Sequence, residues 1–261
     1  MKISIIIPAF NEAKRIGASI HTILDYLTST SWTYEIIVID DGSTDSTFAV
    51  VKTLKNKYIK LVSYNPNRGK GYAVHQGLCQ ARFDLVLFTD ADLSTPIQDI
   101  ERLLPFARSY DVVIGSRNLP NSIITKPQPF VRSRLGKTFP FLVKLLLLPG
   151  IADTQCGFKL FNRKAIELII PRQTLHDFGF DVEILYICRQ AGLSIKEVGI
   201  QWGNAQGSKV RIFRDSLRMF FDIWKIKLRQ IQGRYSLPGT PLDTQNKKIP
   251  HKFTTIRGNH E

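Results

Sequence analysis

Short apolar segments rich in β-branched residues alternate with longer segments of helical periodicity in the amino-terminal half of the sequence. Strands buried on both faces appear as continuous apolar runs, so we expect strands from the short segments. A repeated strand–helix–strand order predicts an α/β fold with a mostly parallel sheet flanked by helices. The expected strands are Ile3–Ile7, Glu35–Ile39, Ile59–Tyr64, Leu85–Thr89 and Asp111–Ile114, and the expected helices are Glu12–Leu27, Thr44–Lys55, Gly69–Arg82 and Pro96–Ala107.

Two aspartates, Asp90 and Asp92, directly follow the fourth expected strand. In an extended chain, residues two apart point to the same side, and like charges held that close repel unless a positive group lies between them. Carboxylate oxygens suit Mg²⁺ or Mn²⁺, and the scattered histidines show no zinc spacing. Alternatively, this is a solvated turn in which Asp92 and Ser94 cap the next helix. Thr95 and Pro96 also provide a start signal for that helix.

Other polar residues are expected at the same edge of the sheet, because ligands of parallel sheets bind beyond the carboxyl ends of the strands. Asp40 and Asp41 follow the second strand. Asn67–Ala73 (NRGKGYA) places Lys70 at the start of a helix, where backbone N–H groups and positive charge favour an anion. A hard cation held by one or two carboxylates is completed by water and substrate phosphates, which points to a nucleotide. The glycines of this segment could also simply form turns.

The charge balance limits the classes of partner. The chain has 36 Lys and Arg residues against 22 Asp and Glu, a net charge of +14, which favours nucleic acid, an anionic membrane surface or phosphorylated substrates. Nucleic acid is disfavoured, because no recognised binding motif is present and acids line the expected ligand edge. The three cysteines, Cys79, Cys156 and Cys188, form no CxxC pair and are expected to be buried thiols.

The carboxyl-terminal half is more basic. A loop with several prolines leads into an apolar helix near 139–151, which is shorter than the roughly 20 residues that cross a membrane. A helix at Phe180–Ala191 and a strand at Ser194–Trp202 are expected next. The pattern of Ile212–Ile231 predicts a long helix. Its large apolar residues and basic residues are typical of a helix that lies among lipid headgroups, but a helix docked on the protein also has an apolar and a charged face. Its apolar stripe is Phe213, Leu217, Phe220, Trp224, Leu228 and Ile231, and its basic stripe is Arg214, Arg218, Lys225 and Arg229.

Several of these segments, in this order, carry a family resemblance. They are SIIIPAFNEAKRI, EIIVIDDGSTDST, NRGKGYAV, FTDADLSTP, VVIGSR, PGIADTQCGFKLFNRKA, FGFDVEILYIC and GSKVRIFRDSLRMFFDI. Together they resemble family 2 glycosyltransferases of GT-A fold, and in particular the dolichyl-phosphate glucosyltransferases and the related mannose synthases. The resemblance covers about residues 2–227. It implies a Rossmann-like nucleotide-diphospho-sugar transferase fold.

The resemblance also implies roles for individual residues. Asp40 or Asp41 would hydrogen-bond the base, Lys70 would lie near the base or ribose, and Asp90 and Asp92 would hold the metal as a DxD motif. The mannose synthases have glutamine where this chain has Ser94, so a third protein ligand is not indicated. The implied nucleotide-sugar-binding residues are Pro8, Ala9, Glu12, Asp40, Asp41, Lys70, Asp90, Ala91 and Asp92.

The chemistry of sugar transfer distinguishes two kinds of acceptor. A hydroxyl needs a general base, whereas a lipid phosphate is already anionic and needs cations to position it, for which arginine is best suited. The acceptor-binding candidates are Arg117, Arg132, Arg134, Lys137, Lys209 and Arg211, each of which could instead be a solvated surface charge. The catalytic candidates are Asp90, Asp92, Arg117, Arg132, Asp153 and Lys209. Asp181 and Glu183 are ranked below them, since they could belong to a core helix.

We therefore expect a peripheral, metal-dependent, inverting glycosyltransferase at the cytoplasmic face of a membrane, without a transmembrane helix or a nucleic-acid partner. With Mg²⁺ or Mn²⁺ it would transfer glucose from UDP-glucose to a polyprenyl or dolichyl phosphate. The alternatives are GDP-mannose as donor, a soluble or polysaccharide hydroxyl as acceptor and, remotely, a nucleic-acid-binding protein. The expected divisions are a GT-A domain at 1–234, comprising a nucleotide-binding half at 1–117, an acceptor half at 118–211 and an amphipathic interfacial helix at 212–234, followed by a flexible polar tail at 235–261.

Overall fold

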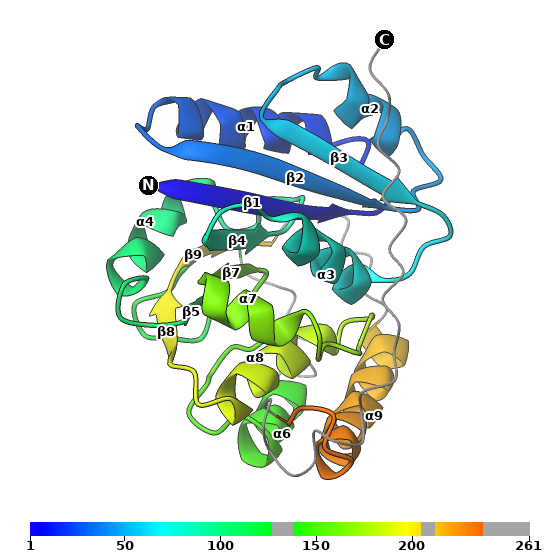
Figure 1. Ribbon diagram of the computed structural model, residues 1–261, viewed down its shortest axis with the longest axis vertical. Coiled ribbons are helices and arrows are strands. Elements are labelled where there is room, and N and C mark those ends of the chain that lie inside the picture. Colours follow the sequence, from blue (N-terminus) through cyan, green and yellow to red (C-terminus); the bar gives the residue numbers. More distant parts are fainter. Residues whose placement is uncertain (127–137, 205–211, 237–261) are drawn as a thin grey trace.

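A mixed seven-stranded sheet forms the centre of the molecule (Figure 1). We describe it from a computed structural model at residues 1–126, 138–204 and 212–236, and for residues 126, 138–141 and 212–219 the description is limited to the backbone. In spatial order the strands are β3 (Ile59–Tyr64), β2 (Thr33–Asp41), β1 (Lys2–Ala9), β4 (Leu85–Thr89), β7 (Phe158–Phe161), β5 (Val112–Ser116) and β8 (Ile195–Gly199).

The expected mostly parallel sheet is confirmed, and all five expected strands are present. The strand β7 was not anticipated. It lies antiparallel between β4 and β5, with Phe158 opposite Thr89 at the carboxyl end of β4. As a result, the residues just before β7 lie beside those just after β4. This insertion also places strands from both halves of the chain in one sheet.

Helices cover both faces of the sheet, as its continuous apolar strands require. In β1, Ile6 packs on the side of α3, whereas Ile5 and Ile7 pack on the side of α1. Figure 1 shows α6 and α9 together at the end of the molecule opposite α2. The helices are α1 (Ile16–Thr28), α2 (Thr47–Thr53), α3 (Lys70–Gln80), α4 (Ile100–Leu103), α6 (Thr138–Leu146), α7 (Arg163–Ile169), α8 (Phe180–Gln190) and α9 (Ile212–Ile231).

The fourth expected helix, at 96–107, is broken into three short pieces. The α4 turn is flanked by 3₁₀ turns at Ile97–Asp99 and Leu104–Phe106. Pro105 explains the second break, because proline has no N–H to continue the helical hydrogen bonds. The N-cap position falls on Pro96, and no side chain caps the first turn, so the expected capping role of Thr95 is wrong.

The expected strand at Ser194–Trp202 is divided between two sheets. Its first part is β8, whereas β9 (Gln201–Gly203) pairs with β6 (Ile123–Lys126) in a separate two-stranded sheet. The division falls at Gly199, where the chain passes close to Asn121, because a Cβ at Gly199 would lie 2.2 Å from Asn121 Oδ1. Neither β6 nor α7 was expected from the sequence.

The boundaries of α9 match the prediction, but the start of the tail does not. Tyr235 is buried and donates its hydroxyl hydrogen to Glu183 Oε1 at 2.7 Å, so it belongs to the folded part. Residues 237–261 lie outside the described residues. Within the described part of the chain, no helix combines the length and apolarity needed to cross a membrane. Cys156 and Cys188 are buried as expected, but Cys79 is exposed.

We predict that Gly77→Ala destabilises the protein. Gly77 lies inside α3, and a Cβ there would come 2.3 Å from Ile6 Cγ2 in the central strand. Such overpacking costs about 1–3 kcal/mol, more than the helix propensity that alanine adds. The free energy of unfolding should fall in denaturant titrations.

Gly17→Ala in α1 is the matched control, because its Cβ would lie 3.3 Å from Val50 Cγ1. We expect its effect to stay below about 1 kcal/mol. Equal stability of the two variants would contradict the close packing of α3 on β1.

Candidate active site

Asp90 and Asp92 lie on a tight turn, not on the extended chain that the sequence suggested. β4 ends at Thr89, and the backbone N–H of Leu93 donates to Asp90 O at 3.2 Å. Leu93 has φ +47°, a conformation that non-glycine residues adopt mainly where the surroundings enforce it. Asp92 Oδ1 accepts from the backbone N–H of Ser94, so the aspartate closes a local turn and does not cap a helix.

Two further hydrogen bonds fix this acid turn, which we define as residues 90–94, to the rest of the molecule. The hydroxyl of Ser19 in α1 donates to Ala91 O at 2.6 Å. The backbone N–H of Gly203 in β9 donates to Ser94 O at 2.8 Å. The carboxylates are therefore mounted on a backbone held from two sides.

Lys70 supplies the positive group that the sequence argument required beside the acids. Its Nζ lies 2.7 Å from Asp90 Oδ1, with both side chains partly exposed. Burial by itself lowers the pKa of Lys70, but the negative charges of Asp90 and Asp181 raise it above its usual value, with a further contribution from Asp92. Lys70 thus lies at the acid turn, and its expected position near the base or ribose stays a prediction.

The start of α3 does not offer the open anion site expected from NRGKGYA. Asp41 accepts from the backbone N–H groups of Arg68 and Gly69 at 2.8 and 2.9 Å. The N–H groups of Gly71 and Tyr72 both donate to the backbone oxygen of His176. The N–H groups of Arg68 and Gly69 therefore bind the protein's own Asp41 carboxylate. Burial raises the pKa of Asp41, although these two backbone hydrogen bonds lower it.

The other nucleotide-binding candidates gather at the carboxyl edge of the sheet. Ala9 lies opposite Asp40 in the pairing of β1 with β2, one residue beyond Pro8. Asp40 accepts from the backbone N–H of Ser43 and from the Ser63 hydroxyl, both at 3.1 Å.

Glu12 lies in the loop beyond β1, where its backbone N–H donates to Thr47 Oγ1 at 2.7 Å and its carboxylate pairs with Arg15. Asn11, a residue the sequence reasoning missed, joins this loop to the one after β2 by accepting from Thr44 N at 2.7 Å.

Gly157 is a site residue that sequence reasoning also missed. It precedes β7 and lies against Asp90, because a Cβ there would be 2.0 Å from Asp90 Oδ2. The bare glycine backbone therefore lies against the whole Asp90 carboxylate, and Lys70 pairs with its Oδ1. The glycine in the segment TQCGF was a possible signal, but its meaning depends on the antiparallel insertion of β7.

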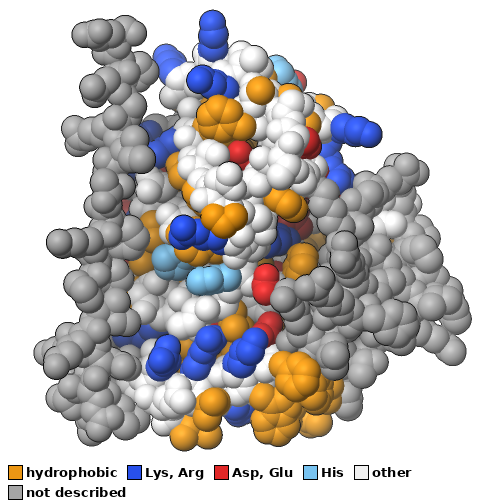
Figure 2. Space-filling model, turned by 90° about the vertical axis from the view of Figure 1, so that its right-hand side faces the viewer, with side chains coloured by type: hydrophobic (Ala, Val, Ile, Leu, Met, Phe, Trp, Pro, Cys, Tyr) orange, Lys and Arg blue, Asp and Glu red, His pale blue; other side chains and the backbone are white. Residues whose placement is uncertain are grey.

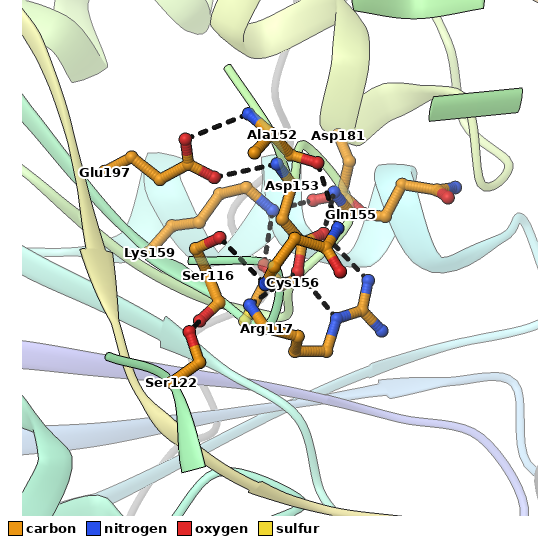
Figure 3. Close-up of polar contacts among 11 residues, drawn as sticks. Ser116, Arg117, Ser122, Ala152, Asp153, Gln155, Cys156, Lys159, Asp181 and Glu197 are labelled. Carbon is orange, nitrogen blue, oxygen red and sulfur yellow. Dashed lines mark hydrogen bonds and ion pairs between the residues drawn. The ribbon is translucent and has the colours of Figure 1, made fainter. Parts of the chain in front are cut away.

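Arg117 and Asp153 form a close ion pair beyond the end of β5 (Figure 3). Arg117 Nε and Nη2 donate to the two carboxylate oxygens at 2.7 and 2.8 Å, and the Arg117 backbone N–H donates as well. Burial would raise the pKa of Asp153, but Arg117 holds it below its usual value. Glu197 in β8 accepts from the backbone N–H groups of Ala152 and Asp153 and so orients the segment. The Asp153 carboxylate is thus committed to Arg117.

A second, fully buried pair joins β7 to α8. Lys159 Nζ donates to Asp181 Oδ1 and, at 2.6 Å, to Cys156 O (Figure 3). Burial raises the pKa of Asp181, against the lowering effect of Lys159 and Lys70. Burial also raises the pKa of Cys156 to about 12, so this thiol stays protonated at neutral pH. The lysine was not a predicted site residue, because its position inside the sheet gives no sequence signal.

Glu183 is structural, in agreement with the core-helix alternative. It is completely buried and accepts from Thr174 N, Leu175 N and the Tyr235 hydroxyl at 2.7–2.8 Å.

The remaining acceptor-side candidates lie outside the described residues: Arg132, Arg134, Lys137, Lys209 and Arg211. The side chains of Phe213, Arg214, Leu217 and Arg218 lie outside them as well.

The acid turn fits a hard divalent cation, although it does not form a complete protein cage. In the described part of the chain, no group of three or more His, Cys, Asp or Glu side chains is arranged to hold a metal ion. Mg²⁺ typically binds through one or two carboxylates and completes its coordination with water and substrate phosphates. Asp90 and Asp92 match that donor set, with Lys70 beside one of the four oxygens.

A mostly parallel sheet with paired acids at its carboxyl edge defines a GT-A-like sugar transferase fold, and solved structures share it. Mannosyl-3-phosphoglycerate synthase from Rubrobacter xylanophilus has a TM-score of 0.65 at 21% identity, covering 94% of this chain and 80% of that one. Glucosyl-3-phosphoglycerate synthase from Mycobacterium tuberculosis, solved with Mn²⁺, UDP-glucose and phosphoglyceric acid, has a TM-score of 0.63 at 20% identity, covering 92% and 81%.

Sequence comparison gives the family. Residues 4–169 match the model of glycosyl transferase family 2, and the chain belongs to that family. It is 36% identical over 250 residues to a dolichyl-phosphate β-glucosyltransferase of Dictyostelium discoideum, covering 90% of this chain and 76% of that one. The corresponding Homo sapiens enzyme is 34% identical over 255 residues, covering 92% and 79%. The expected fold, family and enzyme class are confirmed: the protein is a glycosyltransferase.

We predict that Gly157→Ala leaves the protein folded but strongly reduces sugar transfer. The new methyl group would force the Asp90 carboxylate away from its position, and a displacement of about 1 Å at a reacting centre can cost about 100-fold in rate. The measurement is kcat/KM for transfer, with the melting temperature recorded alongside. Gly17→Ala on α1, whose Cβ would meet Val50, is the control, and wild-type kcat/KM in Gly157→Ala would refute the contact.

Proposed function

We propose that the protein transfers glucose from UDP-glucose to a polyprenyl phosphate of the dolichyl-phosphate class, with inversion at the anomeric carbon. The observation that carries the proposal is the acid turn, fixed at the carboxyl edge of the sheet beside Lys70. The relatives named dolichyl-phosphate β-glucosyltransferase, which align over most of the chain, support the sugar and the acceptor.

For the donor, we propose that Asp90 and Asp92 hold Mg²⁺ or Mn²⁺ together with the diphosphate. Such an ion acts as a Lewis acid that neutralises the charge of the leaving diphosphate. The protein of like fold that was solved with Mn²⁺ and UDP-glucose supports this choice of ligands. Residues 1–117 would form the nucleotide-binding half, with Pro8, Ala9, Asp40 and Asp41 around the nucleoside.

For the acceptor, a phosphate oxygen would attack the anomeric carbon as the bond to the donor diphosphate breaks. A lipid phosphate is anionic at neutral pH, so this step needs no general base. The lack of need for a general base agrees with the state of Asp153, because its carboxylate is already paired with Arg117. We infer that Asp153 positions Arg117. Arg117, which directly precedes the acceptor half at 118–211, would in turn help to orient the acceptor phosphate.

A membrane location is supported by one unusual surface. We define the α6–α9 apolar surface as Leu145, Leu146, Phe220, Phe221, Trp224, Leu228 and Ile231, all of which are exposed. The helix α9, which packs against α6, buries the smaller Ile223 and Ile226, while Trp224 is 59% and Ile231 77% exposed. A helix docked in the ordinary way would turn its largest apolar residues inward.

Figure 2 shows hydrophobic side chains gathered at this end of the molecule, with Lys and Arg side chains next to them. This arrangement suits an interface between lipid headgroups and acyl chains, and we propose that α9 lies there on the cytoplasmic leaflet. Part of the basic stripe serves the protein itself, because Lys225 pairs with Asp222 at 2.8 Å and Arg229 with Glu183 at 3.5 Å.

The donor proposal predicts metal-dependent stabilisation by one nucleotide sugar. With Mn²⁺, UDP-glucose at about ten times its Kd should raise the melting temperature by about 3–6 °C, because it binds only the folded form. EDTA or Asp92→Asn should abolish the shift, and GDP-mannose should give none. A shift that persists in EDTA, or one produced by GDP-mannose alone, would overturn the assigned donor site.

The membrane proposal predicts that Trp224→Gln with Leu228→Gln reduces binding to anionic phosphatidylserine vesicles by at least about tenfold in flotation assays, because two apolar anchors are lost. Phe48→Gln is the matched control, since Phe48 is an exposed aromatic on α2 at the opposite end of the molecule. Unchanged flotation of the double variant would contradict the proposal. The membrane proposal would also be contradicted if the wild-type protein formed a dimer through this surface and did not bind the vesicles.

A further inference from the structure

The ion pair between Lys70 and Asp90 occupies one of the oxygens that the proposed donor site requires. Lys70 Nζ is 2.7 Å from Asp90 Oδ1, and the Asp90 side chain is 31% exposed. Gly157 packs against the same carboxylate, where a Cβ would lie 2.0 Å from Oδ2 and 2.7 Å from Oδ1. Any cation that binds Oδ1 must therefore come into competition with the ammonium group of Lys70.

The backbone of Lys70 is fixed, whereas the end of its side chain is held by a single pair. The preceding residue, Gly69, has φ +99° and donates its N–H to Asp41, and the following residue, Gly71, donates to His176 O at 2.6 Å. The four-carbon stem of lysine extends from this fixed point. Among the described residues, its ammonium makes one ion pair, with Asp90. The group can thus change partner without any movement of α3.

The neighbouring cations are not free to do the same. Arg117 is held by both oxygens of Asp153, and Lys159 is completely buried between Asp181 and Cys156 O. The ring of Phe88 lies 5.3 Å from the Lys70 ammonium and 5.7 Å from that of Lys159, which gives both groups a cation–π contact. Of these three cations, Lys70 is the one whose ammonium has a single polar contact among the described residues, and its partner, the Asp90 side chain, is partly exposed.

We propose that Lys70 is a displaceable counter-cation of the donor site. Its ammonium balances Asp90 when no donor is present, and transfers to the diphosphate when a divalent cation binds Asp90. The inference rests on the proposed function, in which the ion and the diphosphate bind together. No covalent bond is made or broken: Asp90 exchanges the ammonium for the divalent cation, and the ammonium gains the diphosphate as its partner.

This exchange links the two ligands. A metal ion arriving alone must displace the ammonium from Asp90 and leave it beside a second positive charge. When the diphosphate arrives as well, the displaced ammonium gains a new anionic partner. The nucleotide should therefore raise the affinity for metal, and by thermodynamic reciprocity the metal should raise the affinity for nucleotide by the same factor.

The test measures Mn²⁺ binding to the full chain by the electron paramagnetic resonance signal of free Mn²⁺, with and without UDP. In Lys70→Met, the affinity for Mn²⁺ alone should rise by about tenfold, a change that corresponds to about 1.4 kcal/mol. The factor by which UDP increases that affinity should fall by about tenfold, since the counter-cation no longer opposes the metal. A purely structural role for Lys70 would instead lower the affinity for metal.

Two control variants separate charge from shape. Lys70→Arg keeps the positive charge and should retain both the weak binding of Mn²⁺ alone and the effect of UDP. Lys60→Met removes an exposed charge on β3, where Lys60 Nζ donates to Gln80 at 2.6 Å, and should leave both values unchanged. Circular dichroism checks that each variant is folded.

The outcomes distinguish this inference from the proposed function. If UDP promotes Mn²⁺ binding in the wild type and equally in Lys70→Met, the counter-cation role is wrong while the donor site stands. If Lys70→Met binds Mn²⁺ alone no better than the wild type, the role is likewise wrong. Failure of UDP and Mn²⁺ to promote each other's binding in the wild-type protein would overturn the proposed donor site itself, and the inference with it.

Discussion

The carboxylate of Asp90 lies where three segments distant in sequence meet. β4 delivers it to the edge of the sheet, Lys70 at the start of α3 neutralises it, and Gly157 before β7 leaves space for it. The acid turn is fixed in turn by Ser19 from α1 and Gly203 from β9. The Asp90 carboxylate is thus held at a partly exposed position by contacts that come from helices, from the central sheet and from the separate two-stranded sheet.

Other carboxylates near this edge of the sheet also have a positive or hydrogen-bonding partner. Asp41 accepts from backbone N–H groups just before α3, Asp153 pairs with the guanidinium of Arg117, and Asp181 pairs with the ammonium of Lys159. Buried carboxylates of this kind need partners, because desolvation of an unpaired charge costs far more than a hydrogen bond returns. Asp90 differs from them in being partly exposed itself, whereas the carboxylates of Asp41, Asp153 and Asp181 are buried, and this distinguishes a ligand site from the structural pairs around it.

Much of the fold could be predicted from the sequence, because the deciding signals are local. The strands up to Val112–Ser116 are short, mostly apolar segments rich in β-branched residues, and the helical period of 212–231 predicted both ends of α9. The antiparallel β7 could not be predicted, because its four residues look like any short apolar segment and their pairing depends on long-range contacts. The helical period at 96–107 does not show where the helix breaks, which depends on Pro105 and its missing N–H.

For the site, the acids were identified correctly as residues, but their surroundings could not be foreseen. The expected anion site at NRGKGYA was right about the physics, since an anion does bind those N–H groups, but the anion is Asp41 from the chain itself. Gly157, Lys159 and Glu197 act through contacts with Asp90, Asp181 and Asp153, which are distant in the sequence, and no periodicity reveals such contacts. Asp90 and Gly157 are neighbours in space only because β7 enters the sheet beside β4.

The central claim is that the acid turn holds the divalent cation and with it the donor diphosphate. The most direct measurement is the anomalous diffraction of Mn²⁺ in crystals of the protein grown with a UDP-sugar. The account predicts one anomalous peak in contact with both Asp90 and Asp92, with the two phosphates bound to the same ion. A peak and a diphosphate located elsewhere on the molecule would contradict it.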